Sequence, residues 1–288
     1  MTRQIPASEL PMQGDGAVYH LNLHPEELAD NVILVGDPGR VSFISGMFDT
    51  VELCKQNREL ITHTGTYKGK RISVISTGMG TDNIDIVLTE LDALANIDLR
   101  TRTVKENHRT LNLVRIGTSG SLNQDIECGS FLASAYGLGI DGMLRYYDTG
   151  DLICEDVVEA FVRHTDWNAK LPYPYCTPAS SELLTRIAYD MIKGITVSAP
   201  GFFGPQGRFV RAKLKYPELN QKIETFSYDG IPITNMEMEC SAICGLGSLL
   251  GHRPLTVCLI IANRLTGKFL DRYHDQMEEL CGTVLERI

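Results

Sequence analysis

Long apolar runs are missing from this 288-residue sequence. Its main apolar runs, Val32–Val35 and Val257–Ala262, are much shorter than the roughly 20 residues that a membrane-spanning helix needs. The first residues, MTRQIPASEL, also lack the apolar core of a secretory signal peptide. We therefore expect a cytoplasmic protein that has no membrane partner.

An excess of positive charge is absent as well. The sequence contains 27 Lys and Arg residues against 36 Asp and Glu residues, for a net charge of −9. An acidic surface argues against non-specific binding to nucleic acid, so we expect no nucleic-acid partner. It does not exclude an anionic small substrate, because a few converging arginines can form a local positive pocket.

Disulfide and metal-binding patterns are also lacking. The eight cysteines form no C-x-x-C pair, and no Cys/His cluster has the spacing of a zinc site. Cys240 and Cys244 lie one helical turn apart, but we interpret them as small buried apolar residues. Scattered thiols without a framework fit a reducing cytoplasm. We expect no metal site from these residues.

Short apolar runs alternate along the chain with amphipathic stretches of helical length. Val32 belongs to one such run, and the apolar residues between Thr81 and Asn96 recur with a helical period. The alternation predicts an α/β fold of three layers, with a central mixed β-sheet flanked by helices. The main predicted elements are strands at Asn31–Gly36, Arg71–Thr77, Leu111–Ile116, Phe131–Tyr136, Ile195–Ser198 and Leu255–Ala262, and helices at Thr81–Asn96, Ser181–Ile192 and from Leu270 onward.

No linker is evident, so we predict a single domain over residues 1–288. Residues 1–17 are interpreted as an N-terminal extension. Residues 98–110 are polar and basic, and we interpret them as a surface insertion. Ile140–Tyr175, which contains the only tryptophan, is also expected to form surface loop.

The segment Gly36–Arg40 (GDPGR) follows the first predicted strand. A glycine lets the backbone approach a ligand closely, a helix start favours an anion, and an arginine adds a fork of donors. Taken alone, Asp-Pro-Gly is more often an ordinary turn.

The segment Arg115–Gly120 (RIGTSG) ends another predicted strand and is expected to form a turn from Gly117 onward. Arg115 lies among apolar strand residues, where an unpaired charge would be costly. It therefore needs an anionic partner, which is either a ligand or a carboxylate such as that of Glu239.

The segment Asn235–Cys240 (NMEMEC) lies where a predicted strand leads into a helix. Its two glutamates are either ligand-binding residues or ordinary first-turn residues favoured by the helix dipole. Ligands of open α/β sheets bind beyond the carboxyl ends of the strands. Three such segments at strand ends together predict one anion-binding site.

These three segments resemble the signatures of the nucleoside phosphorylase-I family, and the resemblance runs from about Val18 to the C-terminus. Phe202–Arg208 (FFGPQGR) is similar to the segment of uridine-cleaving members in which Phe, Gln and Arg surround the base. In Ile261–Arg264 (IANR), Asn263 stands where purine-specific members usually carry an aspartate.

The resemblance implies the fold of that family and the phosphorolysis of uridine to uracil and ribose 1-phosphate, in pyrimidine nucleoside salvage or catabolism. The partners would be a nucleoside and inorganic phosphate as co-substrate, without an organic cofactor. A purine or broad-specificity phosphorylase remains open, as does a non-catalytic nucleoside-binding protein. Preference among uridine, deoxyuridine and thymidine is open too.

The resemblance also implies roles for individual residues. Arg58 would reach the phosphate, and His20 the ribose 5′-hydroxyl, bound in a neighbouring subunit, which implies a homodimer with shared sites, or a trimer of such dimers. A monovalent cation near Glu59 is left open, because Asn83 replaces a serine of the family. The implied phosphate ligands are Gly36, Arg40, Arg58, Arg115 and Thr118. The implied nucleoside-binding residues are His20, Ser119, Gly120, Phe202, Gln206, Arg208, Glu237, Met238, Glu239 and Arg264. The implied catalytic residues are Arg115, Gln206, Arg208 and Glu239.

Overall fold

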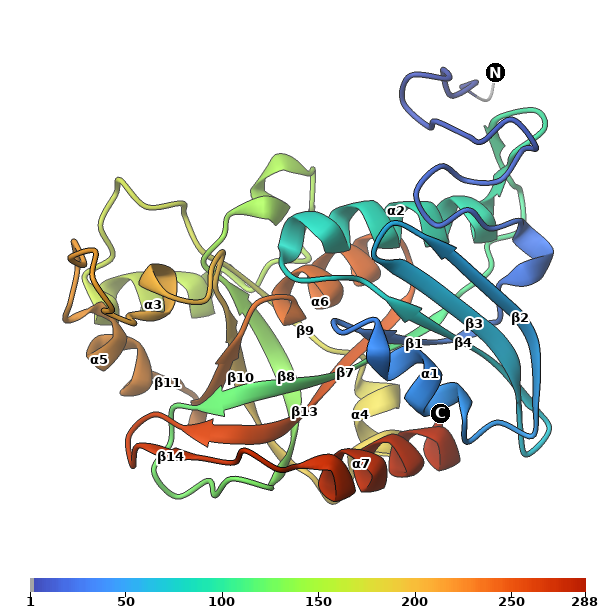
Figure 1. The fold of residues 1–288 in the computed structure, drawn as a ribbon. Helices are drawn as coiled ribbons and strands as arrows, with labels where there is room; N and C mark the ends of the chain where they lie inside the picture. Colours follow the sequence, from blue (N-terminus) through green and yellow to red (C-terminus); the bar gives the residue numbers. More distant parts are fainter. Residues whose placement is uncertain (1–2) are drawn as a thin grey trace.

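The computed structural model describes residues 3–288 and contains one large mixed sheet of twelve strands (Figure 1). Ten strands follow the order β11-β12-β10-β8-β13-β7-β1-β4-β3-β2, while β14 pairs with β13 and β9 with β8. The strands are β1 (Asn31–Val35), β2 (Thr50–Asn57), β3 (Leu60–Tyr67), β4 (Lys70–Ser76), β7 (Asn112–Ser121), β8 (Phe131–Gly139), β9 (Tyr175–Pro178), β10 (Ile192–Ser198), β11 (Ser227–Tyr228), β12 (Ile231–Glu237), β13 (Arg253–Asn263) and β14 (Lys268–Phe269). A separate pair consists of β5 (Ile97–Asp98) and β6 (Thr103–Val104).

Helices cover both faces of the sheet, as the alternation of elements predicts (Figure 1). The two faces follow from strand alternation, because Val32 and Leu34 of β1 belong to one apolar core while Ile33 and Val35 belong to the other. α2 and α6 pack on the first core, and α1, α4 and α7 on the second. The helices are α1 (Gly39–Ser45), α2 (Thr81–Asn96), α3 (Glu155–Thr165), α4 (Ser181–Ile187), α5 (Leu219–Glu224), α6 (Cys240–Leu249) and α7 (His274–Arg287). None of the helices within residues 3–288 combines the length and apolar character that a bilayer span requires.

Five strands of the sheet close into a ring. β7 pairs along its length with β13, and its last two residues pair in the antiparallel sense with β12, where Gly120 lies opposite Met236 and Ser121 opposite Asn235. β12 continues through β10 and β8 back to β13. The turn predicted from Gly117 onward is therefore wrong, because hydrogen bonds from two neighbouring strands keep residues 117–121 extended.

Other differences also arise from long-range packing. Ile140–Tyr175 is not only surface loop, because it contains α3, whose Phe161 is buried in the core. The hairpin of β2 and β3 was not predicted. Exposed and partly buried positions alternate along most of β2, but its apolar residues do not follow this alternation. The helix predicted to end at Ile192 ends at Ile187, and the last helix begins at His274.

The N-terminal residues lie beside the β5–β6 hairpin (Figure 1). The guanidinium of Arg102, in this hairpin, donates to the backbone carbonyls of Ile5, Pro6 and Leu10. The backbone N–H of Ile5 in turn donates to the carbonyl of Arg102 at 2.8 Å. One arginine of the segment 98–110 thus fixes the path of residues 5–10.

Candidate active site

A cavity of about 950 Å³ opens beyond the carboxyl ends of β1, β4 and β12 and along the last residues of β7. The structure brings together in this cavity every predicted site residue except His20 and Arg58. The predicted residues that line it are Gly36, Arg40, Arg115, Thr118, Ser119, Gly120, Phe202, Gln206, Arg208, Glu237, Met238, Glu239 and Arg264.

Arg115 is buried and lies between two carboxylates. Its Nη2 donates to Glu239 Oε2, and its Nη1 lies 3.4 Å from Glu237 Oε2. A Cβ added to Gly117 would lie 2.0 Å from Arg115 Nη1, so the glycine is required by the folded-back guanidinium. Of the two partners that the sequence leaves open for Arg115, the structure thus shows the carboxylate. Within residues 3–288, Arg115 Nε is buried without a hydrogen-bond partner.

Arg40 brings a second guanidinium to the same end of the cavity. Its Nη1 donates to the carbonyl of Ile116 at 3.2 Å. Burial, together with the charge of Arg115, lowers the pKa of Arg40. Two cations that destabilise each other in this way form a suitable site for an anion, because a bound anion would offset their repulsion.

Glu237 fixes the junction between β12 and α6. Its carboxylate accepts from Ser198 Oγ at 2.6 Å and from the backbone N–H groups of Glu239 and Cys240, each at 2.9 Å. Burial raises the pKa of Glu237 to about 7, against the opposing effect of Arg115. Both oxygens are thus occupied within the protein, although the side chain lines the cavity.

Glu239 presents the second carboxylate. Its Oε1 accepts from the backbone N–H of Gly80 at 2.7 Å, and its Oε2 accepts from Arg115. Gly80, at the start of α2, has no predicted role in the sequence analysis. Gly78–Gly80 does follow a predicted strand, so the strand-end rule would have identified it. The two contacts orient the carboxylate and leave lone pairs for ligand hydroxyls.

Phe202, Gln206 and Arg208 form a second group of mutually contacting residues in the cavity lining. Arg208 Nη1 donates to the carbonyl of Phe202 at 2.6 Å and to Gln206 Oε1. The guanidinium also lies over the Phe202 ring, at 3.8 Å from the centroid. Burial and the neighbouring charge of Arg264 lower the pKa of Arg208 to about 10. This part of the lining therefore offers an amide and two guanidinium groups, with one aromatic ring stacked on the guanidinium of Arg208.

Asn263 is buried and also lines the cavity, but none of the hydrogen-bond partners of its side chain does. Its Nδ2 donates to the carbonyls of Asn123 and Ile126 at 2.9 and 2.8 Å. Its Oδ1 accepts from the backbone N–H groups of Leu265 and Thr266 at 3.1 and 3.0 Å. The amide is fully used in holding two loops together.

Asn235 is a further residue of the site that sequence reasoning missed. Its Nδ2 donates to Ser119 Oγ at 2.9 Å, while its Oδ1 accepts from Thr196 Oγ1 at 2.8 Å. It thus orients the hydroxyl of a cavity residue from the adjacent strand. Asn235 belongs to the segment 235–240, but its partner lies more than a hundred positions away, so the sequence alone does not show the contact.

His20 and Arg58 lie outside the cavity, close to each other in the fold. Asn57 Nδ2 donates to the backbone carbonyls of Tyr19 and His20 at 3.1 and 2.9 Å, which joins the β2–β3 turn to the N-terminal segment. Arg58 is exposed at that turn, with a φ of 55°. The two residues that were expected to act in a neighbouring subunit thus share one surface.

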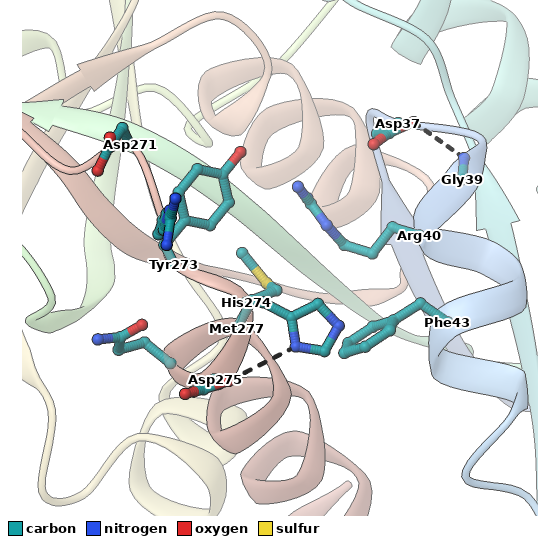
Figure 2. Close-up of a pocket in the computed structure, with 11 residues that line it drawn as sticks. Asp37, Gly39, Arg40, Phe43, Asp271, Tyr273, His274, Asp275 and Met277 are labelled. Carbon is teal, nitrogen blue, oxygen red and sulfur yellow. Dashed lines mark hydrogen bonds and ion pairs between the residues drawn. The ribbon is translucent and has the colours of Figure 1, made fainter.

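A second cavity, of about 680 Å³, lies on the other side of Arg40 between the start of α1 and the residues before α7 (Figure 2). Asp37 and Arg40 line both cavities. In Figure 2 the Tyr273 hydroxyl points toward the Arg40 guanidinium, and the His274 ring packs edge-on against Phe43 at 5.0 Å between centroids. The Arg40 side chain therefore borders both cavities.

Asp92, His108 and His252 are the one group within residues 3–288 whose side chains could converge on a metal ion. His252 Nε2 is buried, 3.3 Å from Asp92 Oδ1. However, His252 Nδ1 accepts a hydrogen bond from the backbone N–H of Leu111 at 3.2 Å, which places the ring proton on Nε2. A metal ligand needs a bare Nε2, so the donor set does not fit a metal.

Comparisons with known proteins identify the family of the chain. The family model described as "Phosphorylase superfamily" matches residues 30–288. A uridine phosphorylase of Thermococcus kodakarensis is 28% identical over 280 residues, which cover 93% of this chain and 86% of that protein. A DeoD-type purine nucleoside phosphorylase of Clostridium novyi is also 28% identical, over 86% of this chain and 89% of its own length.

A solved nucleoside phosphorylase of Trypanosoma brucei, reported to show uridine phosphorylase activity, is 30% identical to this chain. The match has a TM-score of 0.87 and covers 96% of this chain and 98% of the other. The sequence match over most of the chain and the shared fold lead to one conclusion: the chain belongs to the phosphorylase superfamily.

Proposed function

We propose that this protein is a uridine phosphorylase, which converts uridine and inorganic phosphate into uracil and ribose 1-phosphate in pyrimidine nucleoside salvage. The observation that carries the proposal is that two groups of side chains line one cavity: the neighbouring guanidinium groups of Arg40 and Arg115, and the Gln206–Arg208 pair. Phosphate is a co-substrate, and the reaction uses no organic cofactor.

In this reaction a phosphate oxygen forms a bond to C1′ of the ribose while the bond from C1′ to N1 of uracil breaks. The transition state of glycosidic cleavage resembles an oxocarbenium ion. Arg40 and Arg115 hold the phosphate dianion in position to attack and to stabilise the developing cation. Glu239, held by Gly80 N–H and Arg115, accepts hydrogen bonds from the 2′- and 3′-hydroxyls.

The departing base takes the electron pair of the broken bond and becomes anionic before a proton from solvent neutralises it. Gln206 and Arg208 already contact each other, and they donate to the edge of the base where this charge develops. Arg264 adds positive charge nearby, which also lowers the pKa of Arg208.

The position of Asn263 argues against the purine alternative. A purine leaving group is protonated by an acid, and an amide cannot supply that proton. The hydrogen bonds of Asn263 to Asn123 and Ile126 also commit its amide to the loops. The pyrimidine assignment therefore does not depend on the relatives, which include both kinds of enzyme at similar identity.

His20 and Arg58 complete the neighbouring subunit's site in this proposal, so the functional unit is a cytoplasmic homodimer, alone or within a trimer of dimers. Both residues are held on one surface and neither lines the cavity of its own chain. Such an arrangement suits a two-fold interface, in which each subunit supplies the same residues to the other.

A substrate panel tests the proposed function. We expect uracil release from uridine only in the presence of phosphate, with rates far above those for cytidine, adenosine and inosine. Deoxyuridine and thymidine in the same panel define the sugar and methyl preferences. Comparable rates on inosine would overturn the pyrimidine assignment. Release without phosphate would indicate a hydrolase, and binding without release would indicate a nucleoside-binding protein.

A further inference from the structure

Glu90 is a buried acid in the middle of α2, and it lies outside the cavity described above. It is only 4% exposed, and within residues 3–288 it forms no salt bridge with a lysine or arginine. A buried carboxylate is costly unless its oxygens are hydrogen-bonded. Its position therefore calls for an explanation beyond packing.

Three donors from the N-terminal segment surround this carboxylate. Glu90 Oε1 accepts from the backbone N–H of His20 at 2.9 Å, and Oε2 accepts from the N–H of Leu21 at 2.8 Å. His20 Nδ1 lies 2.7 Å from Oε1. Because an ionised carboxylate only accepts hydrogen bonds, Nδ1 carries the proton of this contact.

This contact determines which nitrogen of His20 is available to a ligand. With the proton on Nδ1, the neutral ring has a bare Nε2 that can accept a hydrogen bond. The side chain is 27% exposed, and Tyr19 packs against the ring edge-on at 5.0 Å. Asn57 holds the backbone carbonyl of the same residue. The ring is thus fixed in orientation at the molecular surface.

We propose that Glu90 is a positioning residue for the active site of the partner subunit. It fixes the Nδ1–H tautomer and the orientation of His20, so that Nε2 accepts a hydrogen bond from the ribose 5′-hydroxyl bound in the neighbouring chain. This inference rests on the proposed function, since it presupposes a nucleoside substrate and a shared site. It assigns a functional reason to the only buried acid on α2.

The test compares uridine with 5′-deoxyuridine, which lacks the hydroxyl in question. We expect Glu90→Gln to lower kcat/KM for uridine by about 10-fold, as the loss of an orienting partner usually does. The same variant should change kcat/KM for 5′-deoxyuridine by less than about twofold, because the contact is absent there. His20→Ala should show the same pattern, and the double variant should be no worse than His20→Ala alone.

Glu286→Gln is a matched control, since Glu286 is an exposed acid that binds Lys68 and Tyr67 far from the cavity. Glu286→Gln should leave kcat/KM unchanged for both substrates. Equal losses on both substrates in Glu90→Gln would show that Glu90 has only a structural role, and would overturn the proposal. So would an unchanged rate on uridine.

A second measurement covers a variant that does not fold. ¹⁵N NMR of the wild-type histidines, with the signal of His20 assigned through His20→Ala, reports the tautomer directly. We expect a protonated Nδ1 and a bare Nε2, and the reverse tautomer would overturn the proposal. If the wild type does not cleave uridine at all, the proposed function fails, whereas the tautomer still decides the role of Glu90 toward His20.

Discussion

The Arg115 guanidinium lies between the carboxylates of Glu237 and Glu239, so one buried cation forms ion pairs with two acids. Removing the arginine would leave two like charges close together in a buried place, which costs several kcal/mol. The two acids differ in their partners. Glu237 binds backbone N–H groups, whereas Glu239 also faces the cavity. The environment of Glu237 therefore suits a structural role, and that of Glu239 suits binding a ligand.

The raised pKa of Glu237 predicts a pH-dependent contribution to stability. Its pKa is about 7 in the folded protein and near 4.5 in the unfolded chain, so the folded state binds one more proton between these values. The free energy of unfolding should therefore fall as the pH rises from about 4.5 to about 7, by at most about 1.4 kcal/mol per pH unit from this group. Glu237→Gln should remove this contribution, because an amide can donate to Ser198 Oγ and accept from Cys240 N–H.

Urea unfolding of both proteins at pH 5, 6, 7 and 8 provides the measurement. The stability of the variant relative to the wild type should increase up to about pH 7 and then level off, because the other groups are common to both proteins. Parallel curves would contradict the prediction.

Asn263→Asp is the change that a comparison with purine enzymes suggests, and the structure predicts that it fails. The new carboxylate would face the carbonyls of Asn123 and Ile126, which lose their donor. We expect the free energy of unfolding to fall by about 2 kcal/mol or more, with no inosine cleavage.

Urea unfolding and an inosine assay test this outcome. Asn168→Asp is the control, because the Oδ1 of that exposed residue only accepts from Lys170 N–H and an aspartate can do the same. A stable Asn263→Asp variant that cleaves inosine would show that the asparagine alone excludes purines.

At the scale of the elements, the sequence predicts those helices and strands that depend on local pattern, but not those that depend on pairing with distant strands. α2 has the predicted bounds, Thr81–Asn96, because its apolar period is complete and Gly78–Gly80 marks its start. β7 runs past its predicted end because β13 and β12, which are distant in sequence, supply its hydrogen bonds. β2 could not be recognised, because two of its three partly buried positions carry Lys55 and Asn57 and so leave no alternation of apolar residues.

The packing of α6 on β8 predicts the effect of a single methyl group. A Cβ added at Gly137 would lie 2.8 Å from Ser241 Cα and 3.1 Å from the carbonyl oxygen of Cys240. Gly137→Ala should push the start of α6 away from the sheet and displace Glu239 from the proposed ribose site. We expect a loss of about 1–3 kcal/mol in the free energy of unfolding and a raised KM for uridine.

Gly282→Ala provides the opposite case. Apart from the adjoining backbone of α7 itself, no atom lies within 4 Å of the added Cβ, so the change should stabilise the protein by about 0.5–1 kcal/mol and leave KM unaltered. Urea unfolding and initial rates compare the two variants. An unchanged KM in Gly137→Ala would mean that the start of α6 tolerates the shift.

At the scale of the whole molecule, the candidate site consists of residues from Gly36 to Phe269. The strand-end rule could predict that its three segments meet, and the second and third meet because the last residues of β7 and β12 pair with each other. The sequence left the partner of Arg115 open between Glu239 and a ligand, and it could not predict that Gln206 contacts Arg208 or that Gly80 orients a carboxylate. These contacts depend on side-chain directions that only the assembled sheet determines.

The proposed homodimer with shared sites predicts that two inactive variants restore each other. In that arrangement Arg58→Ala would damage the site of the neighbour, whereas Arg40→Ala would damage its own. In a mixed dimer one site therefore carries both lesions and the other carries none. Random pairing makes half the dimers mixed, so roughly a quarter of all sites should be intact.

Co-refolding of the two variants followed by a uridine assay measures this recovery. Subunit exchange is verified with differently tagged chains, and each variant refolded alone is the control. A mixture that stays inactive despite exchange would show that Arg58 does not act across an interface.

The ring formed by β7, β13, β8, β10 and β12 also has a consequence for biosynthesis. β13 (Arg253–Asn263) lies between β7 and β8, which are consecutive strands in the chain, yet it leaves the ribosome more than a hundred residues after both. Until then the facing edges of β7 and β8 have no partner, and chains with unpaired edges are prone to aggregate. The cavity is therefore completed only at the end of translation. A truncated chain lacking β13 would expose two unpaired strand edges and would lack a complete site.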